Sequence, residues 1–262
     1  MSDRPSVHDQ ARAQFGKTAD AYVNSLGHAK GEDLDLMLAL AGDVRELDLL
    51  DVATGGGHTA LAFARAGARV VASDLTPEML QAAERFIRSQ LPDAHAAFQL
   101  AAAESLPFED DRFDIVTCRI APHHFQDPAA FVREAARVLK PGGRFLLIDN
   151  VAPEDPELAQ AMNHIEKARD PSHVEAYTVH RWIQWLSHAR LDPHHLARWR
   201  RSKDLRAWAA MAQLPDDQID ALQAHILQLP ERTRRYLDVQ HNASGGLSLC
   251  HEAALFMAVK ML

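Results

Sequence analysis

The stretch from Leu47 to His58 constrains the fold more than any other, because an apolar run stops there at a cluster of glycines. The run ends at Val52 and predicts a buried strand, and Thr54 followed by three consecutive glycines ends it. A helical pattern begins immediately afterwards, with apolar residues at 61–64. Glycines let a ligand approach the backbone, and the first helical turn offers free N–H donors. The stretch therefore predicts a ligand-binding turn between a strand and a helix.

Two ligand classes fit this turn. Gly55, Gly57 and Ala60 match the loose fingerprint of dinucleotide-binding proteins. An acid followed by small residues at every second position, here Asp51, Ala53, Gly55 and Gly57, resembles the S-adenosylmethionine (SAM) pocket of class I methyltransferases. Ala53 stands where the first glycine is usual, and alanine permits the same close approach unless its φ is positive. A surface turn without a ligand is the third interpretation.

Composition narrows the classes of protein. The 262 residues suffice for a sizeable core, with 47% hydrophobic and 24% charged residues. No apolar run approaches a membrane span and the N-terminus is polar, so we expect a cytoplasmic protein. The net charge of −8 disfavours nucleic acid as a partner. Cys118 and Cys250 are expected to be free thiols.

A second strand is predicted over Arg69–Asp74, with Pro77 in the first turn of the next helix. Asp74 lies 17 residues beyond Gly57, at a strand end where nucleoside-binding sheets place a carboxylate for ribose hydroxyls. A carboxylate suits this task because its hydrogen bonds are charge-assisted. The alternative is that Asp74 caps the following helix.

Strands and helices alternate along the rest of the chain, which predicts a parallel sheet covered on both faces. Two helices are expected within 8–41, divided at Gly27 and Gly31. In the first of them, Phe15 and Tyr22 either pack on the main domain or belong to a lid that closes over the cofactor. The further expected strands are 96–100, 112–118, 144–149, 194–201 and 253–261, and the further helices are 128–140, 157–168, one around Trp182 and Trp185, and three within 204–239.

Five motifs follow one another between residues 47 and 149. They are Asp51–Gly57, Asp74–Leu80, Ala103–Phe108, Phe113–Asp114 and Pro141–Gly143. Together they resemble class I SAM-dependent methyltransferases, particularly the group of ubiquinone and menaquinone biosynthetic methyltransferases. The resemblance implies an α/β, Rossmann-like fold with a seven-stranded, mostly parallel sheet, an antiparallel last strand and a small helical cap. It divides the chain into an N-terminal helical lid (1–42), a SAM-binding core (43–151), and the remaining core with the substrate cap (152–262).

The resemblance also implies the cofactor, SAM, and its contacts. The 53–57 loop would hold the methionine part, Asp74 the ribose and Leu75 the adenine, with Ala103 and Glu104 at the adenine edge. Arg119 would lie beside the sulfonium, which a guanidinium repels, so we expect it to turn away or to pair with a carboxylate. The full predicted set is Asp51, Ala53, Thr54, Gly55, Gly57, Asp74, Leu75, Ala103, Glu104 and Arg119.

The implied reaction moves a methyl group to an oxygen or carbon of a small-molecule acceptor. His123 and His124 follow the fourth strand and are candidates for a general base, the alternative being that they only pack or cap a loop. Tyr22, Arg169 and His173 are predicted on the substrate side, although Arg169 and Asp170 could equally form a structural ion pair.

Other interpretations stay open at this point. The arginines and lysine of 198–203 would face either an anionic substrate or solvent. The histidine spacing matches no metal motif, so no metal is expected. The competing functions are an NAD-dependent oxidoreductase and a SAM-binding protein without catalysis. A membrane span is not expected, and a homodimer is left open.

Overall fold

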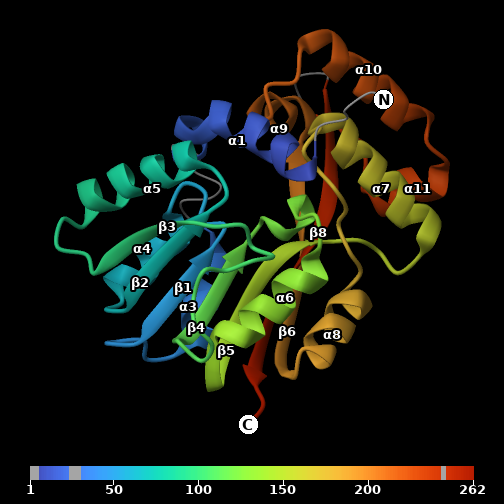
Figure 1. The fold of residues 1–262 in the computed structure, drawn as a ribbon. Helices are drawn as coiled ribbons and strands as arrows, with labels where there is room; N and C mark the ends of the chain where they lie inside the picture. Colours follow the sequence, from blue (N-terminus) through green and yellow to red (C-terminus); the bar gives the residue numbers. More distant parts are fainter. Residues whose placement is uncertain (1–5, 24–30, 243–245) are drawn as a thin grey trace.

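A single sheet runs through the molecule with helices on both faces (Figure 1). The computed structural model describes residues 6–23, 31–242 and 246–262, and of residues 17–23 only the backbone. Seven strands form one path in the order β3-β2-β1-β4-β5-β8-β6, and the two-residue β7 pairs with β8. The strands are β1 (Asp48–Val52), β2 (Arg69–Asp74), β3 (Ala96–Leu100), β4 (Phe113–Arg119), β5 (Leu139–Val151), β6 (Leu191–Asp204), β7 (Gln240–His241) and β8 (Leu247–Lys260).

The strand directions confirm the predicted sheet. Every neighbouring pair from β3 to β5 is parallel, and β8 is antiparallel to both β5 and β6. β8 is the last strand of the chain, so its antiparallel direction is as expected. The strand predicted over 194–201 lies within β6 at the sheet edge.

Alternation along the central strands gives each face its own core. Leu50, Val116 and Leu147 pack with α6 (Pro128–Val138) and α8 (Val179–His188). Their neighbours Leu49 and Ile115 pack on the opposite face with α3 (Glu32–Ala41), α4 (His58–Arg65) and α5 (Pro77–Gln90). Since successive side chains of a strand point to opposite faces, continuous apolar runs were needed to cover both.

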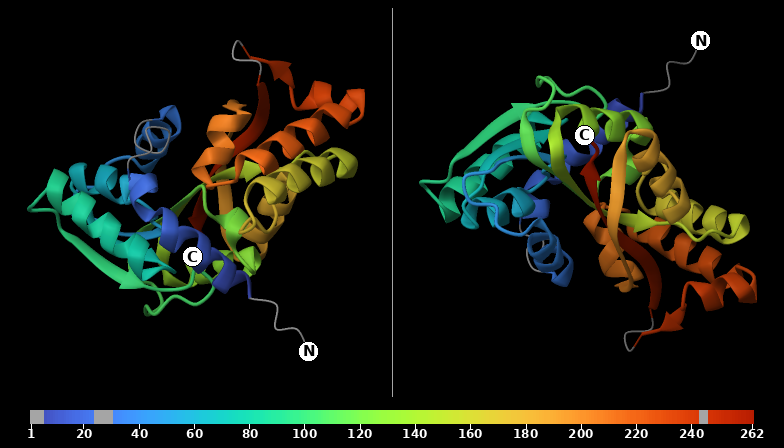
Figure 2. Two further views of the ribbon diagram at one scale, coloured as in Figure 1. Left: turned by 90° about the horizontal axis from the view of Figure 1, so that it is seen from above. Right: turned by 90° about the horizontal axis from the view of Figure 1, so that it is seen from below.

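A second group of helices forms the cap. α7 (Pro156–Arg169), α9 (Leu205–Met211), α10 (Asp216–Gln228) and α11 (Glu231–Tyr236) gather beyond the upper ends of β6 and β8 (Figures 1 and 2). Met162, Ile165, Leu222 and Ile226 belong to their separate apolar cluster. The three helices predicted within 204–239 are therefore present.

The N-terminal helix α1 (Val7–Val23) lies between the two groups (Figure 1). Phe15 packs on Met79 and Ala82 of α5, and Gln14 Nε2 donates to the Ala212 carbonyl oxygen, 3.0 Å away, just after α9. α1 thus contacts both the sheet-containing core and the cap. The side chain of Tyr22 and the residue Gly27 lie outside the described residues, and a lid function of α1 stays a prediction.

One boundary differs from the sequence prediction. α6 ends at Val138 and β5 begins at Leu139, so the Pro-Gly-Gly motif lies inside the strand and the helix does not reach Lys140. A proline at 141 disfavours helical geometry for the residue before it, which explains the early end of the helix.

No helix in the described ranges is long and apolar enough to cross a membrane.

Candidate active site

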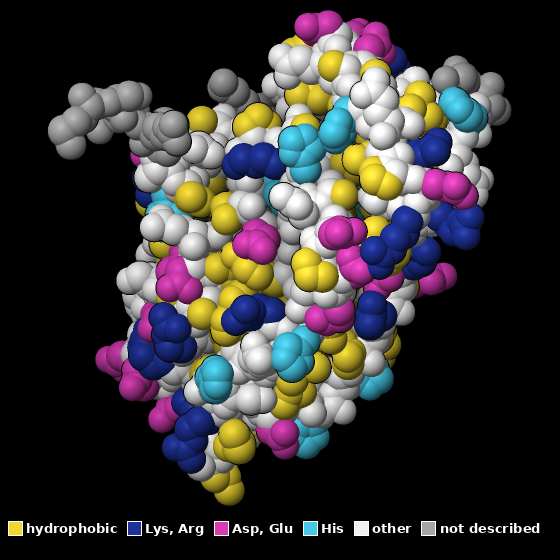
Figure 3. Space-filling view, turned by 90° about the vertical axis from the view of Figure 1, so that its right-hand side faces the viewer, with side chains coloured by type: hydrophobic (Ala, Val, Ile, Leu, Met, Phe, Trp, Pro, Cys, Tyr) yellow, Lys and Arg dark blue, Asp and Glu magenta, His cyan; other side chains and the backbone are white. Residues whose placement is uncertain are grey.

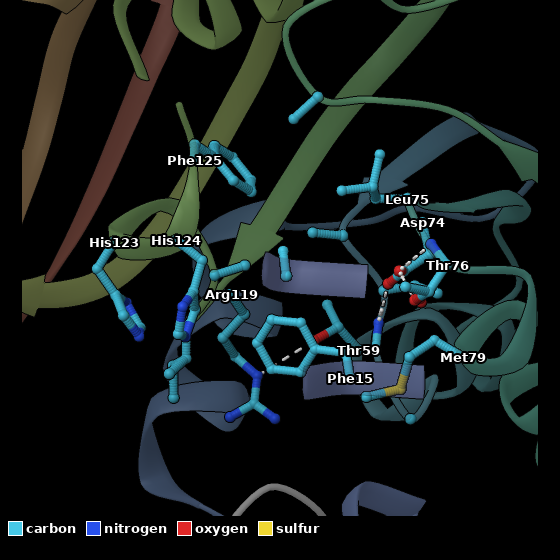
Figure 4. Close-up of a pocket in the computed structure, with 18 of the residues that line it drawn as sticks. Phe15, Thr59, Asp74, Leu75, Thr76, Met79, Arg119, His123, His124 and Phe125 are labelled. Atoms are coloured by element: carbon cyan, nitrogen blue, oxygen red, sulfur yellow. Dashed lines mark hydrogen bonds between the residues drawn. The ribbon is translucent and has the colours of Figure 1, made fainter. Parts of the chain in front are cut away.

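A cavity of about 270 Å³ opens at the C-terminal ends of the parallel strands, beneath α1 and beside the cap. All the predicted cofactor residues except Gly57 line it. Figure 4 shows Asp74, Leu75 and Thr76 on one side and His123 and His124 on the other, with Arg119 and Phe15 between them. We call the first side the cofactor half and the second, together with the lining residues from α7, β6 and α9, the acceptor half.

The cofactor half begins with a buried carboxyl group at the end of β1. Asp51 is 1% exposed, and its oxygens accept hydrogen bonds from Thr54 Oγ1 and Thr117 Oγ1, both at 2.7 Å. Burial raises the pKa of Asp51 to about 6, and the two hydroxyl donors only partly oppose this rise. Burial of the ionised Asp51 carboxylate in the cavity wall therefore costs folding free energy.

The turn after Asp51 has left-handed backbone at three positions. Ala53 has φ +53°, Gly55 +54° and Gly57 +83°, so the condition under which alanine fits without strain is not met at residue 53. A Cβ added at Gly55 would meet no protein atom within 4 Å, which leaves that position open for a ligand. At Gly57 it would lie 3.1 Å from Ala83 Cβ. Gly57 thus serves the packing of the turn on α5, which is why it does not line the cavity.

Asp74 fixes the second turn of the cofactor half. Its Oδ2 accepts the Gly55 N–H at 3.0 Å, and its Oδ1 accepts the backbone N–H and the hydroxyl of Thr76. The N-cap residue of α5 is Thr76, so Asp74 does not cap that helix itself. Burial raises its pKa. The backbone of Leu75 also hydrogen-bonds to this carboxylate. A carboxylate has about four acceptor positions, so a ligand hydroxyl would share or replace a donor of the protein.

Glu104 joins three segments at the rim of the cofactor half. Its Oε1 accepts the Gln126 N–H at 2.9 Å, and its Oε2 lies 3.3 Å from His8 Nε2 on α1. Ala103 beside it is buried and lines the cavity. The contacts place Glu104 where α1 meets the core, and its place at an adenine edge stays a prediction.

Arg119 is paired with a carboxylate, as expected. Its Nη1 lies 2.9 Å from Asp33 Oδ2 and its Nε donates to Thr59 Oγ1 at 3.1 Å. Arg201 Nη2 lies 2.7 Å from the same Asp33 oxygen. Burial alone would raise the pKa of Asp33, but the two guanidinium groups lower it overall. Asp33 thus neutralises positive charge at the centre of the cavity.

His123 and His124 lie side by side on the 3-10 turn η1 (Pro122–His124), with ring centroids 4.2 Å apart. His123 Nδ1 lies 2.6 Å from Asp149 Oδ1 at the end of β5. Burial lowers the pKa of His123, but the Asp149 carboxylate outweighs burial and raises it overall. The environments of the two histidines differ, because burial and the neighbouring His123 hold the pKa of His124 well below its usual value.

A hydrogen-bonded chain through Ser172 and Asp170 orients His124. Ser172 Oγ lies 3.1 Å from His124 Nδ1 and donates to Asp170 Oδ1 at 2.6 Å. With its proton directed at Asp170, the Ser172 hydroxyl accepts from His124, so Nδ1 carries the proton of the neutral ring. Phe15 of α1 packs edge-on against the same ring, with centroids 4.9 Å apart.

The predicted substrate-side residues separate in the structure. Arg169 lines the cavity, is 7% exposed, and lies 3.4 Å from Glu166 and 3.5 Å from Asp170, so it both forms the expected ion pair and reaches the site. His173 does not line the cavity. It is fully buried behind it, with Nε2 2.8 Å from Asn163 Oδ1, and burial lowers its pKa to about 3.

Several lining residues were missed from the sequence. Thr76 and Met79 belong to the quoted 74–80 motif, so that motif contained the signal. Trp208 comes from α9 and had no local signal, whereas Lys203 of β6 belongs to the basic run for which the sequence left a substrate role open. Asp149, which supports His123 from outside the lining, was identified only as a strand end. Within the described ranges, no group of three or more His, Cys, Asp or Glu side chains could hold a metal ion. Independence from metal stays a prediction.

Comparisons with known proteins identify the family. Residues 50–147 match the family model described as a methyltransferase domain. The chain is 38% identical over 247 residues to an uncharacterized methyltransferase, YcgJ, of Bacillus subtilis, covering 94% of this chain and 97% of that protein. The crystal structure of YcgJ superposes with a TM-score of 0.83 at 37% identity, covering 88% of this chain and 99% of that one.

A relative of named activity is also similar. A demethylmenaquinone methyltransferase of Clavibacter sepedonicus is 32% identical over 211 residues, covering 77% of this chain and 83% of that protein. The match to YcgJ, over 247 residues, includes both the glycine turn and the cap. These matches favour the SAM-binding interpretation of the turn after β1 over the dinucleotide-binding one. The chain belongs to the class I methyltransferases, which use S-adenosylmethionine as cofactor.

Proposed function

We propose that this methyltransferase acts on an oxygen or carbon of a small molecule bound in the acceptor half, and that His123 removes the acceptor's proton where one must leave. The observation that supports this most directly is the continuity of one cavity from the turn after β1 to the His123–Asp149 pair. The relative named demethylmenaquinone methyltransferase has a small-molecule acceptor by its name.

The residues of the cofactor half fit a cationic nucleoside ligand. Gly55 leaves open space, Asp74 places a carboxylate in the cavity wall, and the carboxyl groups of Asp51 and Glu104 lie nearby. When bound, SAM supplies an electrophilic methyl group on a sulfonium. Positioning of the acceptor against that group accounts for much of the expected acceleration.

His123 is better prepared than His124 for proton removal. Asp149 accepts from Nδ1, so the neutral ring keeps its lone pair on Nε2. The same carboxylate stabilises the imidazolium that forms when Nε2 takes a proton, and it raises the pKa of His123 above its usual value despite burial. His124 has a lowered pKa and therefore binds a proton poorly.

The test has a binding arm and a transfer arm. Calorimetric titration with SAM, S-adenosylhomocysteine and NAD should show binding of the first two alone. Incubation with methyl-labelled SAM and a panel of phenols, hydroxylated aromatic acids and enolic quinone precursors should then label a small product. The Asp74→Ala variant, which lacks the carboxylate of the β2 turn, serves as the control. Binding of SAM without transfer to any acceptor would favour the non-catalytic alternative.

A further inference from the structure

The basic residues of β6 divide according to which way each side chain points. Arg201 and Lys203 line the cavity. Arg198 and Arg200, one residue out of step, are exposed and bind Glu252 and the Tyr236 carbonyl oxygen. Because side chains alternate along a strand, the basic run satisfies both sequence interpretations at once. One half of it is a solvated face, and the other half faces the site.

The outer half has its charges balanced. On the face of the molecule shown in Figure 3, positive side chains are interspersed with negative ones. Arg232 contacts Asp155 and Glu157, and Arg235 contacts Glu231. No large basic patch is therefore visible on that face, and the positive charge that can serve a ligand is the charge inside the cavity.

The cations inside the cavity are not equally neutralised. Arg201 binds Asp33, and Arg169 lies close to Glu166 and Asp170. None of the ion pairs in the described part of the chain includes Lys203. Burial lowers the pKa of Lys203, and the positive charge of Arg201 lowers it further. Its ammonium group is thus partly desolvated, repelled by neighbours and without a carboxylate partner.

Arg169 adds an unfilled donor at the same place. Its guanidinium lies over the Trp208 ring, 4.6 Å from the ring centroid, and both residues line the cavity. Its Nε is buried and has no hydrogen-bond partner in the structure. Buried donors are normally satisfied, so this arginine is held in the cavity wall by its stacking on Trp208 and its ion pairs, with one donor left unused. Trp208 offers a flat apolar surface next to this donor.

We propose that the acceptor of this methyltransferase carries a carboxylate or phosphate group, and that Lys203 binds this group in the acceptor half, where the positive charge of Arg169 also lines the cavity. The inference rests on the proposed function and names the chemical class of its substrate. The acceptor's reactive atom then lies between the anionic group and the cofactor half, where His123 lines the cavity. Charge-assisted hydrogen bonds to an anion are the stronger kind, so they would dominate selection of the acceptor.

The test uses the full chain saturated with S-adenosylhomocysteine and three probes of similar size. Benzoate and phenyl phosphate carry the two anionic groups, and benzamide is the neutral isostere of benzoate. Calorimetry should show at least one anion binding tenfold or more tightly than benzamide. The anion that binds more tightly identifies the group as carboxylate or phosphate.

Three variants, each of which removes one positive charge, sharpen the test. Lys203→Met and Lys203→Gln should each reduce the preference for the anion about tenfold. Lys140→Met removes one positive charge beside Asp114, outside the cavity lining, and should leave the preference unchanged. S-adenosylhomocysteine should bind all three variants as it binds the unaltered protein, which confirms folding.

The outcomes separate the two levels of inference. Failure of the unaltered protein to bind S-adenosylhomocysteine would contradict the proposed function itself. Normal binding of S-adenosylhomocysteine, with neither anion bound more tightly than benzamide, would overturn only the anionic acceptor. A preference for anions that survives both changes at Lys203 would also overturn the assignment of that residue.

Discussion

The cofactor half and the acceptor half are built by contacts of different reach along the chain. In the cofactor half, Asp51 binds Thr54 three residues away and Asp74 binds Thr76 two residues away, although Asp51 also binds Thr117, 66 positions away. Around the acceptor half, the contacts His123–Asp149, His124–Ser172 and Asp33–Arg201 join residues 26, 48 and 168 positions apart. The turns of the cofactor half are thus largely encoded in short motifs, whereas the acceptor half exists only once the sheet and cap have assembled.

The largest expected effect is a loss of turnover on substitution of His123, which would show that the acceptor half performs the proton transfer. His123→Gln keeps a polar side chain of similar size but cannot act as a base, so turnover should fall about 100- to 10,000-fold. S-adenosylhomocysteine affinity should change less than threefold, because the substitution lies outside the cofactor half. Label-transfer kinetics and calorimetry measure the two quantities.

The matched change is His124→Gln on the same turn, which should lower turnover less than tenfold. Asp149→Asn should also shift the acid limb of the rate profile to lower pH, since loss of the carboxylate lowers the pKa of His123 and frees the neutral ring at lower pH. Retention of turnover by His123→Gln, or equal loss in both histidine variants, would remove the assignment of His123.

The second prediction asks whether the cofactor half stores a folding cost. The pKa of Asp51 is about 6 in the fold and about 3.9 in an unfolded chain. Ionisation therefore destabilises the fold progressively as the pH rises from 4 to 6, by up to about 3 kcal/mol above that range. Asp51→Asn should raise the melting temperature at pH 8 and have little effect at pH 4.

Asp48 on the same strand provides a control of opposite sign. A hydrogen bond from Arg69 lowers the pKa of Asp48, so its ionised form stabilises the fold above pH 4. Asp48→Asn should therefore lower the melting temperature slightly at pH 8. If the gain from Asp51→Asn were the same at both pH values, burial of its charge would not be the cause.

The third prediction measures how much of cofactor binding one carboxylate carries. Asp74→Ala removes an acceptor for hydroxyl donors, and hydrogen bonds to charged groups contribute about 2 kcal/mol. S-adenosylhomocysteine affinity should fall roughly 30-fold, while the exposed Asp217→Ala on α10 leaves it unchanged. Calorimetry decides, and an unaltered affinity in the Asp74 variant would refute its role in holding the nucleoside.

The smallest effect concerns the strained backbone at residue 53. Ala53→Gly relieves a positive φ and should stabilise the fold by about 0.5–1 kcal/mol, or about 1–4 °C in melting temperature. The same substitution at Ala62, inside α4, should destabilise by about 1 kcal/mol. A loss of stability in both variants would show that the left-handed turn costs nothing with alanine.

The difference in sequence separation between contacting residues also explains what could be predicted from the sequence. Periodicity located β1 and β2 almost to the residue, because burial of parallel strands leaves apolar runs. The short apolar stretch of β3 was also located, although that edge strand is only partly buried. The motifs located Asp51, Asp74 and the turns between them. Nothing local could show that Asp149 faces His123 or that Arg201 reaches Asp33, since these pairs form through strand order and register. The same limit explains why His173 was placed in the site when it lies behind it.

The alternation of β6 has a consequence for how such an enzyme can change its substrate. Arg201 and Lys203 face the cavity, while the alternating residues Arg200 and Ser202 are exposed. A single substitution at an inward position would alter acceptor preference without disturbing the apolar core or the turns that hold the cofactor. The edge strand therefore gives evolution, and a protein engineer, a small set of independent positions for switching acceptors while methyl donation stays intact.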